Sequence, residues 1–192
     1  MTVAEDDAPE APGRLALVEE FVNTVELPDG EDRLGTVPSA RAWLAAHDVA
    51  APALQEASRR QLVDLREALR HVLEGTERGD VPADAAELVM QRLNAARLAV
   101  VISPSGVHTH PAEGAQGLDA LYAELAAAMI TATIDGTWQR LKVCHNDECR
   151  WAFYDRSKNV RRAWCSMRSC GCQAKSRAYR ARKRESSSGA GG

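Results

Sequence analysis

The chain contains 192 residues, of which 45% are hydrophobic and 27% are charged, so it can form one or two ordinary soluble domains. Aromatic residues make up only 5% of the chain, and the expected core is therefore aliphatic. The sequence has no apolar run of about 18 residues, which excludes a membrane-spanning helix, and its acidic first residues exclude a secretory signal. We expect a cytoplasmic protein that has no membrane partner.

The net charge of −3 conceals two segments of opposite charge. Residues 138–184 contain fourteen Lys and Arg residues and only three acidic residues, a net charge of +11. The rest of the chain contains ten basic and 24 acidic residues, a net charge of −14. This division indicates two modules, of which the basic one binds a polyanion. The alternative is that the two segments neutralise each other within the molecule.

The N-terminal part of the chain is expected to be helical after a disordered start. Residues 1–13 are acidic and contain Pro and Gly, which favours disorder. Residues 14–26 place apolar side chains every three or four positions, the pattern of a helix with one buried face. Ser39 is a suitable N-cap for a short helix that follows it. Pro52 is expected in the first turn of a longer helix that ends near Gly75.

A β-hairpin is expected in the middle of the chain, between two further helices. Asp80 or Asp84 is expected to cap the helix that precedes it. Residues 98–103 and 107–110 are rich in β-branched residues and flank a Pro-Ser-Gly turn, the pattern of two antiparallel strands. The second helix covers residues 118–134 and ends at an Asp-Gly pair. The side chains expected to face inward from it are Leu121, Leu125, Met129 and Ile130.

Five cysteines lie close together near the C-terminus, and a strand over 138–143 is expected to lead into the first. Four of them form two pairs, each with four intervening residues, and fifteen residues separate the pairs. Each pair forms a tight turn that directs two sulfurs at one point, so the pairs together provide a tetrahedral zinc site. Such a site has no open position and is structural. The predicted Zn²⁺ ligands are Cys144, Cys149, Cys165 and Cys170.

The fifth cysteine, Cys172, lies two residues after the last predicted ligand. One interpretation is a bystander thiol at the start of a helix. The other is a redox role, in which this thiol exchanges with a zinc ligand or is oxidised together with it, so that zinc is released.

The residues after the cysteine pairs form a strongly basic segment. Residues 173–184 contain good helix formers and no helix breaker, and no acidic residue occurs from Lys158 to Arg184. A basic helix fixed by zinc at its N-terminal end suits the DNA major groove and its phosphates. Alternatively, such a helix binds RNA or an acidic protein, or it is exposed to solvent and binds no partner. The predicted DNA contacts are Arg161, Arg162, Arg168, Lys175, Arg177, Arg180, Arg182, Lys183 and Arg184.

Two parts of the sequence resemble known families. The stretches that resemble the CGNR zinc finger family are 153–159, 161–167, Cys170-Gly171 and Lys175. The stretches that resemble ABATE, the α-rich domain of bacterial and archaeal transcriptional regulators, are 15–17, 21–24 and 43–44. The finger family is named after a Cys-Gly-Asn-Arg motif at its last ligand, whereas this chain has Cys-Gly-Cys-Gln at 170–173.

Pattern and resemblance together predict a mainly α (α+β) fold. An ABATE-like α-rich domain with one β-hairpin is expected over 14–136. A CGNR-type zinc finger that ends in a basic helix is expected over 137–185. The tails 1–13 and 186–192 are expected to be disordered.

The resemblance implies a bacterial transcriptional regulator whose finger binds DNA in a zinc-dependent manner, in the cytoplasm at the nucleoid. The N-terminal domain would then form a homodimer or bind a small-molecule effector. The sequence contains no P-loop, dinucleotide-binding fingerprint, nucleophile elbow or HExxH motif, so no enzyme is predicted. The alternatives are a redox-sensing zinc-thiolate protein that acts through Cys172, and a protein-interaction module that acts through the basic segment.

Overall fold

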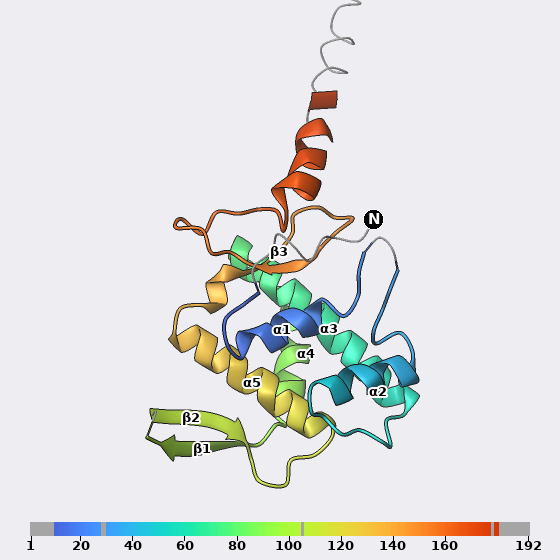
Figure 1. The fold of residues 1–192 in the computed structure, drawn as a ribbon, viewed down its shortest axis with the longest axis vertical. Helices are drawn as coiled ribbons and strands as arrows, with labels where there is room; N and C mark the ends of the chain where they lie inside the picture. The colour runs from blue at the N-terminus through green and yellow to red at the C-terminus, as the bar shows by residue number, and fades with distance from the viewer. Residues whose placement is uncertain (1–9, 28–29, 105, 178, 181–192) are drawn as a thin grey trace, which may run out of the picture.

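The computed structural model describes residues 10–27, 30–104, 106–177 and 179–180. Its helices form one elongated body, with a β-hairpin at one end and the cysteine-rich segment at the other (Figure 1). The last helical residues project away from the body beyond the cysteine-rich segment. Within the described residues, no helix has the length and apolar composition that crossing a membrane requires. The predicted tail 186–192 lies outside the described residues, as do the first nine residues of the N-terminal segment.

The first helix, α1 (Leu15–Val22), begins where expected but ends four residues before the predicted end at Glu26. The chain leaves the helix at Asn23 because the side chain of Asn23 hydrogen-bonds to the backbone of the distant Ala152. Val25 then enters an isolated β-bridge instead of a further helical turn. A tertiary contact therefore overrides the apolar pattern that continued beyond Val22.

The second helix, α2 (Val37–Ala46), corrects the predicted N-cap. Thr36 caps the helix, since its Oγ1 accepts a hydrogen bond from the Ser39 N–H at 3.2 Å. In return, the Ser39 hydroxyl accepts a hydrogen bond from the Thr36 N–H at 3.1 Å. The two residues thus form a capping box. The prediction that Ser39 caps the helix was wrong because Ser39 occupies the third helical position.

The long helix α3 (Glu56–Arg78) has Gln55 at its N-cap position, so the prediction that Pro52 lies in its first turn was wrong. It continues one turn past Gly75 to a left-handed Gly79. At Gly75 a Cβ atom would lie 2.5 Å from the Cα of Val81, so only glycine lets the chain turn back so closely. The next helix, α4 (Ala83–Leu93), has Pro82 at its N-cap position.

Neither Asp80 nor Asp84 caps α4 with its side chain, so that prediction was wrong. Asp84 lies inside the first turn, where a carboxylate still favours the positive end of the helix dipole.

The predicted β-hairpin is confirmed as β1 (Leu98–Ser103) and β2 (Gly106–Pro111). The strands are antiparallel, with Leu98 opposite Pro111 and Ser103 opposite Gly106. Helix α5 (Leu118–Ile134) has the predicted bounds, but its Ile130 is 43% exposed and does not face inward. Buried alanines fill much of the inner face of α5, so the apolar pattern could not tell which side Ile130 occupies. The mainly α fold with one central hairpin is as predicted.

After α5, the 3-10 turn η1 (Trp138–Arg140) replaces the first half of the predicted strand over 138–143. A second hairpin follows, formed by β3 (Leu141–Val143) and β4 (Ala152–Tyr154). Four buried apolar residues of this hairpin belong to the same hydrophobic core as those of the helices α1 to α5, whereas Phe153 packs against the cysteines. The residues that the hairpin adds to this core are Leu141, Val143, Ala152 and Tyr154. The helices and the cysteine-rich segment are therefore parts of one packed body.

Candidate zinc site and basic surface

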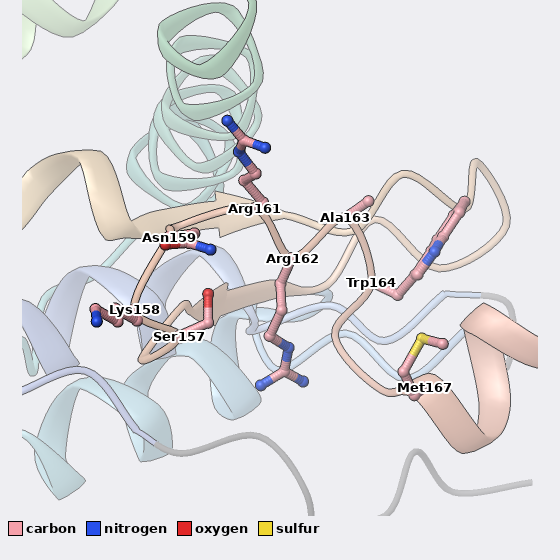
Figure 2. Close-up of a pocket in the computed structure, with 8 residues that line it drawn as sticks. All are labelled: Ser157, Lys158, Asn159, Arg161, Arg162, Ala163, Trp164 and Met167. Carbon is pink, nitrogen blue, oxygen red and sulfur yellow. The ribbon is translucent and has the colours of Figure 1, made fainter.

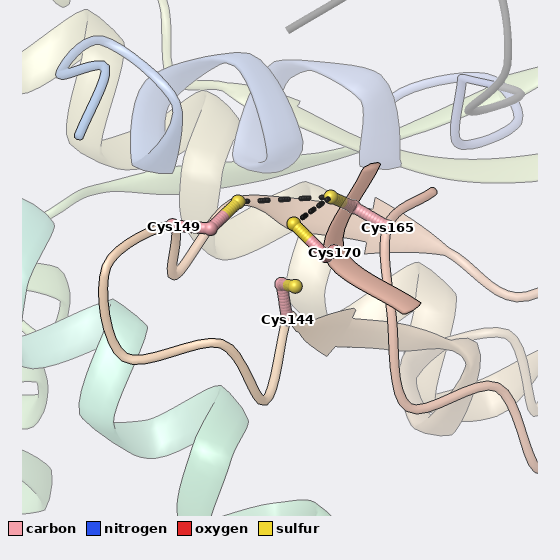
Figure 3. Close-up of side chains that lie close together, drawn as sticks. All are labelled: Cys144, Cys149, Cys165 and Cys170. Carbon is pink, nitrogen blue, oxygen red and sulfur yellow. Dashed lines mark hydrogen bonds between the residues drawn. The ribbon is translucent and has the colours of Figure 1, made fainter. Parts of the chain in front are cut away.

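The four predicted ligands converge at one point, although they come from four separate places in the cysteine-rich segment (Figure 3). All four side chains are buried, and their Sγ atoms lie within 4.8 Å of one another. The Sγ atom of Cys165 lies 3.6 Å from that of Cys149 and 3.8 Å from that of Cys170. These distances are too long for disulfides. They match the separation of about 3.8 Å expected for four thiolates around a tetrahedral zinc ion with Zn–S bonds of about 2.3 Å.

Local backbone structure shapes both cysteine pairs. In the first pair, the N–H groups of Cys149 and Arg150 donate to the Asn146 carbonyl at 2.7 and 3.0 Å. Arg150 adopts a left-handed φ of 48°, which ends this turn. The second pair spans the π-helical turn η2 (Met167–Gly171), whose N-cap Ser166 accepts a hydrogen bond from the Ser169 N–H. Both turns direct their sulfurs inward, which is the arrangement that the spacing predicted.

The proximity of the sulfurs makes the site dependent on a cation. Hydrogen bonds from Cys149 and Cys165 lower the pKa of the Cys144 thiol. The same contacts with Cys144 raise the pKa of the thiols of Cys149 and Cys165. Four thiolates at these distances therefore do not form together without a compensating charge. A bound Zn²⁺ supplies that charge, and four sulfur ligands leave it no open coordination position for catalysis.

A side chain that sequence reasoning missed, Asn146, connects the zinc site to the last helix. Its Nδ2 atom lies 3.6 Å from the Cys170 sulfur and donates to Oε1 of Gln173 at 3.2 Å. Its Oδ1 atom accepts a hydrogen bond from Arg177 at 2.7 Å. An N–H donor next to a thiolate ligand orients and stabilises that ligand. The last helix is thereby attached to the metal site at two positions one turn apart.

Helix α3 also contacts the segment that contains the first cysteine pair. Arg70 is 1% exposed and donates to the carbonyls of Val22 and Arg150. One turn further along, Glu74 accepts a hydrogen bond from Arg150 at 3.0 Å. One further turn along, Glu77 forms an ion pair with Lys142 at 3.1 Å and a hydrogen bond with His145 at 3.0 Å.

Three residues on one face of α3 thus hold the zinc site against the helical body. His145 follows the first cysteine in the sequence, but its ring contacts Glu77 and is not part of the four-sulfur cluster.

A buried ion pair shapes the loop between the two cysteine pairs. The fully buried carboxylate of Asp155 accepts hydrogen bonds from the N–H groups of Ser157 and Arg162 at 2.9 and 2.8 Å. Lys142 lies 3.6 Å from this carboxylate and donates to the Val160 carbonyl at 2.9 Å. Burial tends to raise the pKa of Asp155, but these hydrogen bonds and the charge of Lys142 outweigh it and lower the pKa. The loop is therefore fixed by an ionised carboxylate at its base.

The predicted DNA-contacting residues differ in their surroundings. Arg162 turns inward, where it donates to the Cys165 carbonyl at 2.5 Å and lies 5.3 Å from the centre of the Phe153 ring. Arg177 is held by Asn146, as described above. The predicted contacts that are exposed are Arg161, Arg168, Lys175, Arg177 and Arg180. Arg182, Lys183 and Arg184 lie outside the described residues. Cys172 is exposed and is not part of the four-sulfur cluster.

A groove of about 450 Å³ lies beside the zinc site, between the loop 157–163 and the turn η2. Arg161 and Arg162 leave the loop in opposite directions, so only part of the charge of this loop faces any one side (Figure 2). Trp164 and Met167 form the apolar wall of the groove (Figure 2).

Fold and site together define a helical body joined, through a shared core, to a four-cysteine zinc finger. Two family models match the chain in the same order. Residues 15–136 match ABATE, described as "Putative stress-induced transcription regulator", and residues 140–183 match the CGNR zinc finger. Because the ABATE model covers more than half of the chain, the protein belongs to the ABATE family. No curated protein matches the chain.

The family matches confirm both predicted resemblances and point, with the four-cysteine cluster, to zinc as the cofactor. The structure also gives a role to one departure from the finger motif. Gln173 occupies the position of the motif arginine and accepts the hydrogen bond from Asn146, whereas Cys172 occupies the position of the motif asparagine and is exposed.

Proposed function

We propose that this protein controls transcription by binding DNA through its basic C-terminal helix, with zinc holding that helix in place. The main observation behind the proposal is the way in which the helix is attached to the rest of the protein. Its first turns are attached to the metal site through Asn146, and its remaining described residues project into solvent (Figure 1). A helix fixed at one end and free of neighbours along its length fits a DNA major groove.

The charges on this helix support a phosphate-rich partner. Lys175 and Arg180 are exposed and lie on a helix whose sequence contains no acidic residue. Arg161 and Arg168 are exposed on the neighbouring loop and turn, and they extend the positive surface toward the zinc site. Such cations bind phosphates and position the helix, while one or two of them read base edges. Zinc has a structural role in this proposal, because the buried four-sulfur site leaves no open ligand position.

A single helix of this kind contacts a short half-site, and dimeric regulators bind two such half-sites. We therefore assign dimerisation to the helical body, with sensing of a small-molecule effector as the second role of the same part. The family description, which names a stress-induced regulator, supports a protein that responds to a signal.

The test is a titration of zinc-loaded protein with fluorescent DNA fragments from the region upstream of its own coding sequence, over a series of salt concentrations. If about seven phosphates are engaged, log affinity falls with log salt with a slope near −6. Replacing Lys175 and Arg180 together by Ala is expected to make the slope less steep by about two. Chelation of zinc is expected to abolish selective binding.

Arg60→Ala is the matched control, since the Arg60 side chain is 71% exposed on α3, away from the basic helix. It removes one surface cation and is expected to leave DNA affinity unchanged. A response that does not depend on salt, or equal losses in the control and in the helix variant, would contradict DNA binding by this helix.

A further inference from the structure

The hairpin formed by β1 and β2 exposes an unusual amount of apolar surface. Val100 is 69% exposed, Ile102 is 80% exposed and Val107 is 68% exposed. In an antiparallel pair, residues opposite each other share a face, and residues two apart on a strand share it too. Since Ile102 lies opposite Val107, all three side chains lie on one face of the hairpin. The function proposed above assigns no role to this face.

The two edges of the hairpin differ. The outer edge of β2 faces the helical body, because Arg14 donates to the Thr109 carbonyl at 2.5 Å. That carbonyl therefore points away from β1. Thr109 lies opposite Val100, and in such a pair both residues direct their N–H and C=O groups outward.

The backbone N–H and C=O groups of Leu98 and Ile102, which lie two residues to either side of Val100, also point outward. Within the described part of the chain, the sheet of this hairpin consists of β1 and β2 alone, so no third strand pairs with the outer edge of β1.

The outer edge of β1 lacks the features that prevent strands from pairing with other molecules. Natural edge strands are protected by charged side chains, by proline or by a covering segment. Residues 98–111 contain no Asp, Glu, Lys or Arg, and their two prolines lie in the turn and at the end of β2. An apolar and unprotected edge of this kind is a pairing surface.

We propose that β1 pairs with β1 of a second copy of this chain, antiparallel and across a twofold axis at Val100. The result is one four-stranded sheet in the order β2, β1, β1 of the partner, β2 of the partner. Val100 then faces Val100 of the partner subunit, and Leu98 faces Ile102 of the partner subunit. Three such pairs provide about six backbone hydrogen bonds, and the apolar side chains of both hairpins form one continuous face. This inference rests on the proposed dimer and gives it a location.

The charge of the protein and the symmetry of the pairing both favour a second copy of this chain as the partner of the β1 edge. Residues 14–137 contain 19 acidic and ten basic residues, so two helical bodies carry net charges of the same sign and repel each other. The hairpin carries no formal charge apart from its histidines, and it is the part on which two such bodies meet without repulsion. Pairing of β1 with β1 also uses both open edges, because β2 of each copy faces its own helical body. The assembly therefore closes as a dimer and does not grow into a fibre.

The test measures the molar mass of the full-length, zinc-loaded protein by sedimentation equilibrium in the absence of DNA. Wild type is expected at twice the chain mass of 20.8 kDa. Val100→Lys and Val100→Glu each place like charges across the twofold axis, and each is expected to raise the dissociation constant by about 100-fold. An equimolar mixture of the two variants is expected to restore the dimer, because opposite charges then face each other.

Val107→Lys is the matched control, since Val107 lies on the same face but on β2, away from the pairing edge. It is expected to leave the dimer intact, and far-UV circular dichroism with zinc content verifies that every variant is folded. A monomeric wild type would overturn both the dimer and the surface. Dimers that persist in both Val100 variants would overturn the surface but keep the proposed dimer. If each variant is monomeric and the mixture does not reassociate, Val100 does not face Val100 of the partner subunit, and the pairing of β1 with β1 across that axis is wrong.

Discussion

Replacement of Asn23 by Ala tests whether the helical body and the zinc finger form one cooperative unit. The Asn23 side chain donates to the Ala152 carbonyl at 2.9 Å and accepts from the Ala152 N–H at 2.8 Å. Ala152 is 0% exposed, and it lies on β4, 129 residues away along the chain. The substitution therefore leaves one buried donor and one buried acceptor without their partner, between the end of α1 and the finger.

The expected loss follows from these two groups. A buried polar backbone group left without its hydrogen bond costs about 1–3 kcal/mol, so the two together cost about 3 kcal/mol when water partly enters the space. A domain of this size has a free energy of unfolding of about 5–15 kcal/mol, and the variant is expected to lose a large part of it. With a denaturant slope of about 2 kcal/mol/M, the urea midpoint falls by about 1.5 M.

The assay is urea unfolding at saturating zinc of a reference protein in which Trp43 and Trp138 are replaced by Phe, so that only Trp151 and Trp164 of the finger fluoresce. Far-UV circular dichroism follows the helices, and tryptophan fluorescence follows the finger. Both signals are expected to change together in the reference protein and in its Asn23→Ala variant. Asn159→Ala is the control, since Asn159 is exposed in the loop beside the zinc site. A loss no larger than that of the control, or a reference protein in which the two signals change at different urea concentrations, would refute the reasoning.

Two further predictions concern pH and metal. Burial raises the pKa of Glu19 to about 7, so the folded state holds its proton more tightly than the unfolded state, and the stability from this site is lost as pH rises through about 7. In urea titrations, Glu19→Gln is therefore expected to gain stability relative to wild type as pH rises from about 4.5 to about 7, and a difference that stays constant over this range would contradict the shifted pKa. Chelation of zinc is expected to release the loop 156–165 and the turn η2, while α3 keeps its packing. Hydrogen exchange should then accelerate in the first two and stay slow in α3, and simultaneous acceleration everywhere would show that zinc holds the whole fold.

The zinc site could be predicted from the sequence because its signal is local. Two short cysteine pairs specify the ligands whatever surrounds them, and the structure brings the same four sulfurs together. The hairpin β1–β2 and the bounds of α5 were also predictable, since their apolar patterns are bounded by turn residues. The N-cap of α2 was not, because Thr36 and Ser39 are both good caps and only the backbone decides between them.

The contacts that support the zinc site could not be predicted, because each joins residues far apart in the sequence. Asn23 is an ordinary residue on an amphipathic helix until β4 is placed next to it. Glu77 looks like a surface charge on α3, and its role appears only when Lys142 and His145 are placed opposite it. Asn146 lies between two ligands without any pattern of its own, and its contact with Arg177 depends on the direction of the last helix.

The shared hydrophobic core has a consequence for how such a finger can be inherited. The two family matches meet between residues 136 and 140, yet the side chains of β3 and β4 on one side of that junction fill the same core as α1, α3 and α5 on the other. A gene segment that encoded the finger alone would produce a hairpin with a bare apolar face. Recombination at this junction is therefore expected to preserve function only when a matching helical segment is transferred together with the finger. The two segments, and not the finger alone, form the evolutionary unit.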